Sequence, residues 1–527
     1  MSVRSRFVAM WAARVRHTAP RRRVGGLAIG LVALTVLQGG CDRPEGELSQ
    51  RATTLTVFHR GNEREVFAPL RYSAQFLIFA SLVKYDKQGD IGPALARGWE
   101  HSSDYREWTF HLRTDVRWHD GVPFTARDVR FTKDLFQKAW DVPNPVQVRV
   151  LDDSTFTLLS PDPLDALDWW EVVYPEHLLA GLDPAEFYEW EFWMHPVGVG
   201  PYRFARRLPH TMVELEANPD YYAGKPRIER VVLKFGEMPL NELLAGGVDV
   251  ARVERADLPK LRDDPRFRAY DHLYPNMGWR NGIYWNQRDP LFRDPAVRRA
   301  LTLAIDRPEL RRLLNLPDNL PVVDVLFTGR QWRRGDLPEG LAYDPGRAAA
   351  LLDGVGWRDD DGDGLREREG TEFRFTALAP QTEQHDKAAL YVQESLRRVG
   401  IRMEIQPTER SVVFARLQSG DYQAAFTRLD LGNRVDRAHF FGEGSRLGYV
   451  NAEVTRLIKA IPSAIDPETQ DSIYRTLWPF LEEDLPAVFL YPGAWSIVAN
   501  RRVRGLESPF HADPVMHMEE LWLEEGE

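Results

Sequence analysis

The sequence predicts an α/β fold with more than one domain. The chain has 527 residues, which is more than a single hydrophobic core usually organises. Hydrophobic residues make up 43% of the chain and charged residues 28%, the composition of a folded globular protein. Residues 373–407 alternate between strand, helix and strand patterns, so they predict a β-α-β unit with parallel strands and a right-handed crossover.

The first half of the chain mixes strand and turn signals. The alternating residues 54–58 predict a strand. Residues 108–125 predict two extended pieces around an Asp-Gly turn, and residues 212–235 predict two strands joined by a loop rich in proline and glycine. Between these pieces, Asp128 or Thr125 is placed to cap a helix.

The second half of the chain has clearer helix boundaries. Asp294 followed by Pro295 predicts a helix start, because proline suits the first helical position. Asp306 with Glu309 three residues later predicts a capping box at the next helix. The further predicted elements are a strand at 373–379, a helix at 385–400, a strand at 401–407, a helix-to-strand step at 414–429 and strand-like pieces at 487–493 and 496–506.

Charge and motif content exclude several classes of function. The formal net charge is −10, and the first 40 residues contain seven arginines and no acidic residue, so the rest of the chain is more acidic still. An acidic body argues against nucleic acid as a partner. A single cysteine cannot form a disulfide within the chain. Walker A, zinc-protease and G-x-S-x-G motifs do not occur, and we expect no cofactor.

The N-terminal region contains a targeting pattern. Residues 1–23 are basic, and residues 24–37 are apolar over about the length of a signal-peptide core. Two glycines then precede Cys41. This pattern resembles a bacterial lipoprotein signal, which implies that residues 1–40 are a signal peptide and that Cys41 carries a lipid anchor. Residues 41–51 would then form a tether. The alternative is an ordinary membrane anchor with an incidental cysteine.

Eight stretches of sequence are spread along most of the remaining chain. They are LVKYDKQGDIGPALARGWEHSSDYREWTFHLRTDVRWHDGVPFTARDVRFT (82–132), PVGVGPYRF (196–204), ANPDYYAGKPRIERVVLKF (217–235), LLAGGVDVA (243–251), DPAVRRALTLAIDR (294–307), GWRDDDGDGLRE (356–367), LRRVGIRMEI (396–405) and LQSGDYQAAF (417–426). In order and approximate spacing this set resembles the family 5 extracellular solute-binding proteins, which are the peptide- and nickel-binding subunits of ABC importers.

The resemblance implies a particular architecture. We expect a two-lobe fold like that of class II periplasmic binding proteins, with an enlarged first lobe and a ligand cleft between the lobes. The first lobe is expected at residues 52–275 plus 490–527, and the second at 276–489. The chain is expected to cross the hinge near residues 274–286 and again near 490–493.

The resemblance also implies a function. We expect the substrate-binding component of an ABC importer, which captures peptides or similar small solutes outside the cytoplasm and delivers them to membrane permease subunits. It would be a monomer attached to the membrane through Cys41, and it would bind its ligand by lobe closure rather than act as an enzyme. Receptors or sensors for nickel, haem or sugar oligomers share this fold and remain alternatives.

Four aromatic residues are predicted to contact the ligand. Trp279, Tyr284 and Trp285 lie near the first expected hinge crossing, and Trp495 lies just after the second. Aromatic rings with a polar tip suit a cleft that is partly apolar and partly wet. The resemblance places these positions where the lobes meet.

Two charged residues, Arg428 and Asp430, are also candidates for ligand contact. In peptide-binding relatives, a Gly-Trp-x-x-Asp stretch supplies an aspartate that pairs with the α-amino group of the peptide. Here the Gly, Trp and Asp positions are occupied by Arg428, Leu429 and Gly432. Asp430 lies two residues early and is a candidate as a displaced amine anchor. Arg428 is a candidate for a carboxylate through its two-pronged donor geometry. Alternatively, both are solvated rim charges.

The acidic run at 359–370 resembles a calcium loop. Asp359, Asp361 and Asp363 alternate as EF-hand ligands do. However, the position of the bidentate glutamate is occupied by Gly370. We therefore interpret the run as a turn, and we expect no metal site there.

Other metal and catalytic patterns are weak. His111 and His119 are eight residues apart and, on a strand, would be separated by about 26 Å, too far to share an ion. Ser81 and Lys84 match the S-x-x-K pattern of penicillin-binding enzymes. A secreted hydrolase that uses this pair is the alternative from another class, but the companion K-T-G run does not occur.

Overall fold

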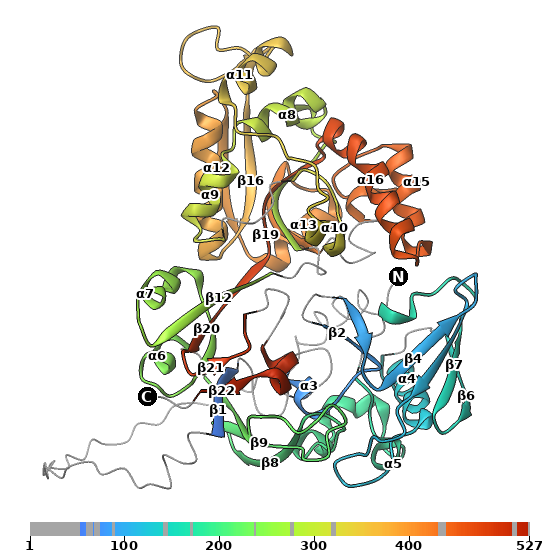
Figure 1. Cartoon of the computed structure of the whole chain (residues 1–527). Helices are drawn as coiled ribbons and strands as arrows, with labels where there is room; N and C mark the ends of the chain where they lie inside the picture. Colours follow the sequence, from blue (N-terminus) through green and yellow to red (C-terminus); the bar gives the residue numbers. More distant parts are fainter. Residues whose placement is uncertain are drawn as a thin grey trace, which may run out of the picture.

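The computed structural model of the chain consists of two lobes (Figure 1). It describes residues 53–524 except for 60–66, 68–73, 87–89, 141–145, 169–171, 237–238, 274–278, 318–322, 431–438 and 508–513. Cys41, the predicted signal peptide and the predicted tether lie outside the described residues. Both lobes combine sheets and helices, which confirms the predicted α/β fold in two lobes.

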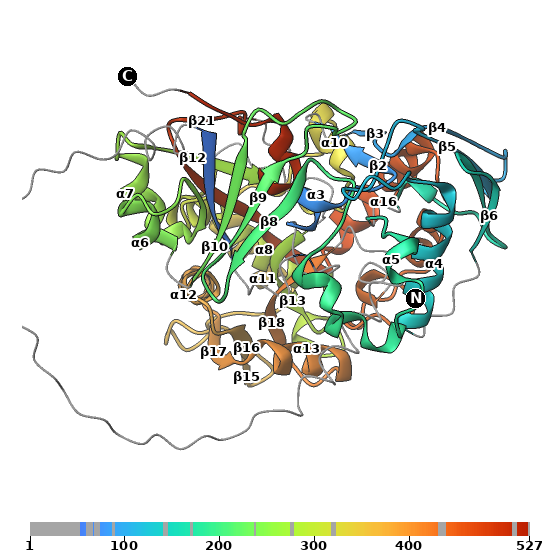
Figure 2. The same ribbon diagram turned by 90° about the horizontal axis from the view of Figure 1, so that it is seen from below.

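The first lobe is built on a seven-stranded sheet with the order β12-β20-β11-β1-β10-β9-β8. β1 is parallel to β10 and β11, and the other neighbours are antiparallel. Seen from below, β1, β10, β9 and β8 lie side by side (Figure 2). The strands are β1 (Thr54–His59), β8 (Tyr202–Leu208), β9 (Met212–Ala217), β10 (Arg230–Phe235), β11 (Val250–Val253), β12 (Phe267–Leu273) and β20 (Ala494–Asn500).

A four-stranded antiparallel sheet and short elements complete the first lobe. The sheet has the order β4-β5-β7-β6, with β4 (Ala96–His101), β5 (Glu107–Leu112), β7 (Thr155–Leu159) and β6 (Gln147–Asp152), and α4 (Ala126–Trp140) packs beside it. The shorter elements are α3 (Gln75–Ile78), α5 (Glu176–Leu179), α6 (Pro239–Leu244), α7 (Leu258–Arg262), β2 (Val83–Tyr85), β3 (Ile91–Pro93), β21 (Val503–Arg504), β22 (Trp522–Leu523), η1 (Ala166–Asp168), η2 (Pro184–Glu189), η3 (Glu191–Met194), η4 (Arg255–Asp257) and η7 (Pro514–Glu520).

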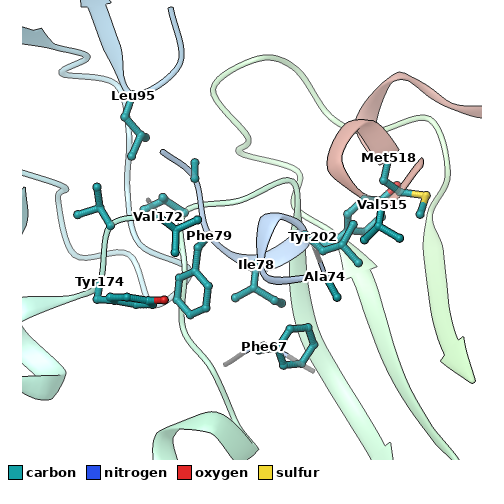
Figure 3. Packing of buried hydrophobic residues seen from close by; sticks show 14 of the residues in the cluster. Phe67, Ala74, Ile78, Phe79, Leu95, Val172, Tyr174, Tyr202, Val515 and Met518 are labelled. Carbon is teal, nitrogen blue, oxygen red and sulfur yellow. The ribbon is translucent and has the colours of Figure 1, made fainter. Parts of the chain in front are cut away.

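The end of α3 brings two apolar side chains into the main core of the first lobe. Ile78 and Phe79 are fully buried. Figure 3 shows Phe79 beside Tyr174, and their ring centroids are 5.1 Å apart. On the other side of α3 lie Tyr202 of β8 and Met518 of η7 (Figure 3). The core therefore joins segments from both ends of the described chain.

A close contact between the end of α3 and residues 198–200 explains two of the sequence motifs. Gly200 donates its N–H to the Ile78 carbonyl at 2.7 Å. A Cβ at Gly198 would lie 1.8 Å from the same oxygen, so only glycine fits this close approach. His119 accepts a hydrogen bond from the Gly198 N–H through Nδ1 (3.2 Å), and its Nε2 donates to the Gly200 carbonyl (3.1 Å). The WHDG and VGVGP motifs thus hold each other in place.

The second lobe is built on a five-stranded sheet with the order β17-β16-β18-β13-β19. β16, β17 and β18 are mutually parallel, and β13 is antiparallel to both of its neighbours. β16, α12 and β17 form the predicted β-α-β unit. The strands and crossover helices are β13 (Trp279–Trp285), β16 (Arg374–Pro380), α12 (Glu383–Arg397), β17 (Arg402–Thr408), α13 (Arg410–Ser419), β18 (Ala424–Asp430) and β19 (Ala487–Pro492).

The N-caps predicted at Asp294 and Asp306 are confirmed, whereas only the Asp306 half of the predicted capping box is seen. Asp294 accepts a hydrogen bond from the Ala296 N–H at the start of α8, and Asp306 accepts one from the Glu309 N–H at the start of α9. The further elements are α8 (Pro295–Leu303), α9 (Arg307–Leu313), α10 (Gly329–Arg334), α11 (Pro345–Gly354), α15 (Ala452–Ala460), α16 (Pro467–Asp484), β14 (Glu367–Arg368), β15 (Thr371–Glu372), η5 (Pro290–Phe292) and η6 (Ile461–Ser463).

A strand pair in each lobe lies next to the connection between the lobes, and β19 leads into β20 there (Figure 1). β12 pairs with β20 in the first lobe, and β13 pairs with β19 in the second. The chain passes from β12 to β13 and returns from β19 to β20 through Gly493. The expected boundary at residues 489/490 falls inside β19, which stays with the second-lobe sheet as far as Pro492.

Candidate functional site

The parallel strands of the second lobe end at one edge of the sheet. β16 and β17 pair as far as Pro380 opposite Thr408. β16 and β18 pair at two positions, and the second of these is Leu378 opposite Ala425. β18 then continues to Asp430 without pairing to β16. The carboxyl ends of β16 and β18 therefore diverge.

The connections of these strands make this edge a topological switch point. α12 leads from β16 to β17, whereas α13 leads from β17 back across β16 to β18. α12 packs on the face that carries Ala377 and Phe426, and α13 packs on the opposite face, which carries Leu378 and Ala425. In α/β sheets, ligands bind outside the carboxyl ends of the strands at such a point. We call residues 380–385, 408–410 and 428–430 the switch-point edge.

The switch-point edge lies beside the hinge. Trp279, the first residue of β13, pairs opposite Asp430. Arg280 pairs opposite Pro492, the last residue of β19. These are the strand ends that lead into the first lobe, so the switch-point edge faces the junction of the two lobes.

His385 lies in the first turn of α12 at this edge. Its backbone N–H donates to Thr382 Oγ1 (3.2 Å), and the same oxygen lies 2.7 Å from His385 Nδ1. The Thr382 hydroxyl can donate to Nδ1 or accept from Nδ1–H, so this contact is compatible with either ring tautomer. Nε2 is buried and has no hydrogen-bond partner among the described residues.

Two arginines surround His385 with positive charge. Burial, Arg410 and Arg428, in that order, lower the pKa of His385 to about 4, so its ring is neutral at pH 7. Arg410 is the first residue of α13, and Arg428 lies near the end of β18. Both are exposed. The switch-point edge therefore carries two cationic side chains and a buried ring nitrogen of His385.

Three of the residues predicted from sequence come together here. Trp279 and Asp430 are cross-strand partners, and Arg428 is opposite Asn281, two positions along the same strands. Trp495 is placed separately, in β20 of the first lobe opposite His272, two residues beyond Gly493.

The structure corrects the prediction for Trp285 and Tyr284. Both side chains are 0% exposed. Trp285 stacks on Phe292 with ring centroids 5.1 Å apart and meets the edge of Phe375, so neither ring face is free for a ligand. Tyr284 packs in a second core and donates its hydroxyl to the Arg280 carbonyl (3.2 Å). Their strand alternates between two buried faces, which the sequence pattern did not distinguish from a cleft.

His385 and Arg410 were missed in the sequence. His385 lies in the first turn of α12, which directly follows the parallel strand β16. Arg410 is the first residue of α13, which directly follows the parallel strand β17. A search for polar residues at the carboxyl ends of the predicted β-α-β strands would have found both.

A separate hollow of about 370 Å³ lies against the face of the sheet that α13 covers. Its lining includes Leu378 of β16, Gln406 of β17 and Arg416 of α13. The strand connections favour the switch-point edge as the ligand site.

The candidate metal residues are engaged in local contacts. In the acidic loop, Asp359 accepts hydrogen bonds from the Gly362 and Gly364 N–H groups, and Asp361 accepts one from the Asp363 N–H. These hydrogen bonds from backbone N–H groups to aspartate side chains stabilise the loop as a turn. His119 contacts the VGVGP loop as described above, whereas His111 on β5 lies 3.7 Å from Glu100.

The Ser81–Lys84 pair does not form a catalytic dyad. The Ser81 hydroxyl donates to the Val83 carbonyl at 2.6 Å. Lys84 Nζ pairs with Glu519 at 3.3 Å. Although burial lowers the pKa of Lys84, the negative charge of the nearby Glu519 carboxylate helps to raise it above its ordinary value overall. Lys84 is therefore protonated and cannot serve as a base for Ser81.

Two lobes joined beside paired strands, with a switch-point edge at the junction, are the architecture of a two-lobe binding protein. The chain matches the model described as "Bacterial extracellular solute-binding proteins, family 5 Middle" over residues 90–440. It belongs to the family 5 bacterial extracellular solute-binding proteins, as the sequence motifs predicted.

Individual relatives agree with this assignment. The oligopeptide-binding protein AppA of Bacillus subtilis is 26% identical over 79% of this chain and 80% of its own length. A putative ABC transporter peptide-binding protein of Brucella ovis is 30% identical over 56% of this chain and 58% of its own length. NikZ from Campylobacter jejuni, solved in complex with Ni(L-His), is 22% identical and has a TM-score of 0.69 over 89% of this chain and 99% of its own.

One structural finding bears on membrane attachment. Within the described ranges, no helix has the length and apolar character needed to cross a bilayer.

Proposed function

We propose that this protein is the substrate-binding component of an ABC importer. It captures a peptide or a similar small solute outside the cytoplasm and delivers it unchanged to membrane permease subunits. The observation that carries the proposal is the switch-point edge beside a hinge of paired strands. Relatives named as oligopeptide-binding and ABC transporter peptide-binding proteins support it.

The ligand binds between the lobes and favours the closed state, because only that state lets both lobes contact it. In the second lobe, Trp279, Arg428 and Asp430 contribute to the site, as their shared position at the hinge end of the sheet supports. In the first lobe, Trp495 contributes from the start of β20. The first lobe comprises residues 52–275 plus the C-terminal segment after β19. The second lobe comprises the intervening residues up to the end of β19.

The mature protein is a monomer that begins at Cys41 and is held to the membrane by a lipid on that residue. The basic and apolar segments before Cys41 support this part of the proposal. Residues 42–51 are the tether, which leaves the lobes free to move and to dock on the permease.

Mass spectrometry of small molecules released from the purified, denatured protein tests the proposed function. We expect peptides or similar small organic solutes in about equimolar amount to the protein. Recovery of such a cargo requires that it dissociates slowly enough to survive purification. Recovery of nickel, haem or sugar oligomers alone would replace the peptide assignment by one of the alternative receptors. Conversion of added peptides into products by the protein would contradict a binding role.

A further inference from the structure

We propose that His517, Glu519 and Glu520 form a binding site in the first lobe for a divalent transition-metal ion such as Zn²⁺. All three residues belong to η7, near the C-terminus of the chain. Because η7 packs against α3, the ion would fix the C-terminal segment to the core of the first lobe. The inference goes beyond the proposed function, since the ion would be a resident part of the fold and not the cargo.

The first argument is the geometry of the three side chains. One ligand atom from each residue lies within 4.8 Å of the other two. His517 Nδ1 is 3.8 Å from Glu520 Oε1, which is too long for a hydrogen bond. Ligand atoms about 2.1 Å from a tetrahedral zinc ion are separated by about 3.4 Å, so small rotations of these side chains would close a shell around one ion.

The second argument is the kind of ligand and its burial. One imidazole nitrogen and two carboxylate oxygens are a donor set that suits zinc and related divalent ions. His517 is only 4% exposed, and the side chains of Glu519 and Glu520 are 12% and 23% exposed. Two carboxylates held close together and largely out of water repel each other, and a divalent cation offsets that repulsion.

The neighbouring cation, Lys84 of β2, is compatible with such an ion. Its Nζ donates to Oε1 of Glu519 at 3.3 Å. This contact engages one oxygen of Glu519 and leaves Oε2 for the ion. The carboxylate would then stand between the ammonium group and the metal, and the site would link η7 to β2.

The third argument is a buried hydroxyl beside the same cluster. Tyr202 on β8 is 0% exposed, and its hydroxyl forms no hydrogen bond with any residue that the structure describes. Figure 3 shows Tyr202 beside Met518 of η7. Burial, and then the negative charge of Glu519, raise the pKa of Tyr202, so the hydroxyl lies in the field of that carboxylate. A metal-bound water or carboxylate would accept its proton in a hydrogen bond, as outer-shell groups require.

Metal titration of the mature chain tests the inference. The protein is purified without a histidine tag and stripped with EDTA, which is then removed. Calorimetry should show about one Zn²⁺ per chain, with a dissociation constant of about 10 μM or lower. The melting temperature should rise with the Zn²⁺ concentration, because the ion binds the folded chain.

Matched variants locate the ion. His517→Gln and Glu520→Gln should each weaken Zn²⁺ binding at least about tenfold, because each removes one of three ligands. His111→Gln is the control. His111 lies 3.7 Å from Glu100 in another, more exposed histidine–glutamate pair, and its replacement should leave Zn²⁺ binding unchanged.

A Tyr202→Phe variant separates metal binding from folding. In EDTA it should melt at the same temperature as the natural chain or higher, because it loses only a buried hydroxyl that has no partner among the described residues. It should nevertheless bind Zn²⁺ about tenfold more weakly, since the hydroxyl supports the ligands of the ion.

Each outcome decides the question. The absence of both a heat of binding and a melting-temperature shift with Zn²⁺ would overturn the inference. Equal Zn²⁺ binding by the natural chain, His517→Gln and Glu520→Gln would place the ion elsewhere and overturn it as well. If these two variants do not fold, Tyr202→Phe decides, because unchanged Zn²⁺ binding in that variant contradicts the site. All of these results leave the proposed capture of cargo untouched.

Discussion

At the scale of single residues, His119 is a neutral connector rather than a metal ligand or base. Both of its ring nitrogens are used by the backbone of Gly198 and Gly200. Burial is the main reason that the pKa of His119 is lowered to about 4, with Arg203 contributing in the same direction. Protonation would break the hydrogen bond from the Gly198 N–H, so the neutral ring belongs to the folded state.

This predicts an acid-dependent loss of stability. The unfolded histidine has a pKa of about 6.5, so between about pH 6.5 and 4 the unfolded chain takes up a proton that the folded chain does not. The contribution of the neutral His119 ring to stability should therefore be fully present above about pH 6.5. The free energy of unfolding should fall by about 2–3 kcal/mol as the pH drops from there to 4. Urea denaturation across this range measures it. His119→Asn should be less stable at pH 7 and show a shallower pH dependence, and an unchanged slope would contradict the assignment.

A second residue-scale prediction concerns Gly200. A Cβ there would lie 2.6–2.7 Å from the backbone of Ile78 and Leu77. Gly200→Ala should therefore lower the free energy of unfolding by about 2–3 kcal/mol. Gly181→Ala is the control, since a Cβ at Gly181 meets no atom within 4 Å. Equal melting temperatures for the two variants would mean that the contact with α3 is unimportant.

At the scale of elements, a buried ion pair joins parts of the second lobe. Arg307 at the start of α9 contacts both oxygens of Asp324, at 2.5 and 3.1 Å, and their side chains are 1% and 2% exposed. Arg307 also donates to the Leu341 carbonyl (2.7 Å) and the Phe489 carbonyl on β19 (3.4 Å). One guanidinium thus ties α9 to two loops and to a hinge strand.

Removal of this arginine should be costly. Arg307→Ala leaves the Asp324 carboxylate buried without its partner, which should lower the free energy of unfolding by about 3–5 kcal/mol. Arg312→Ala removes an exposed arginine on the same helix, which pairs with Glu309, and should cost about 1 kcal/mol or less. Urea titration of both variants is the measurement. A similar small loss in both would show that burial of the pair is unimportant.

The elements also show what the sequence could predict. The β-α-β unit and the caps at Asp294 and Asp306 follow from local patterns, and the structure has them. Whether a ring on β13 faces a core or a cleft depends on which helices cover the sheet. That is a tertiary property, which the sequence pattern does not contain. The sequence therefore predicted Trp285 as a ligand contact, whereas in the structure it lies in the core. His385 and Arg410 needed the strand order, which no local pattern contains.

At the scale of the whole molecule, the proposed lipid anchor makes a prediction about the N-terminus of the mature protein. Cys41 should be the first residue of the mature protein and should carry lipid. Mass spectrometry of the N-terminal peptide from membranes checks this, and Cys41→Ser should remove the lipid and block the processing that depends on it. A mature chain that begins elsewhere, or that has an unmodified Cys41, would contradict the anchor.

The central claim is that the lobes close on a cargo. Small-angle scattering of the mature chain, stripped of ligand and then saturated with the molecule recovered from it, tests this most directly. The account predicts a smaller radius of gyration in the saturated sample, because closure brings the two lobes together around the cargo. Superimposable scattering curves, while the melting temperature shows that the ligand is bound, would contradict it.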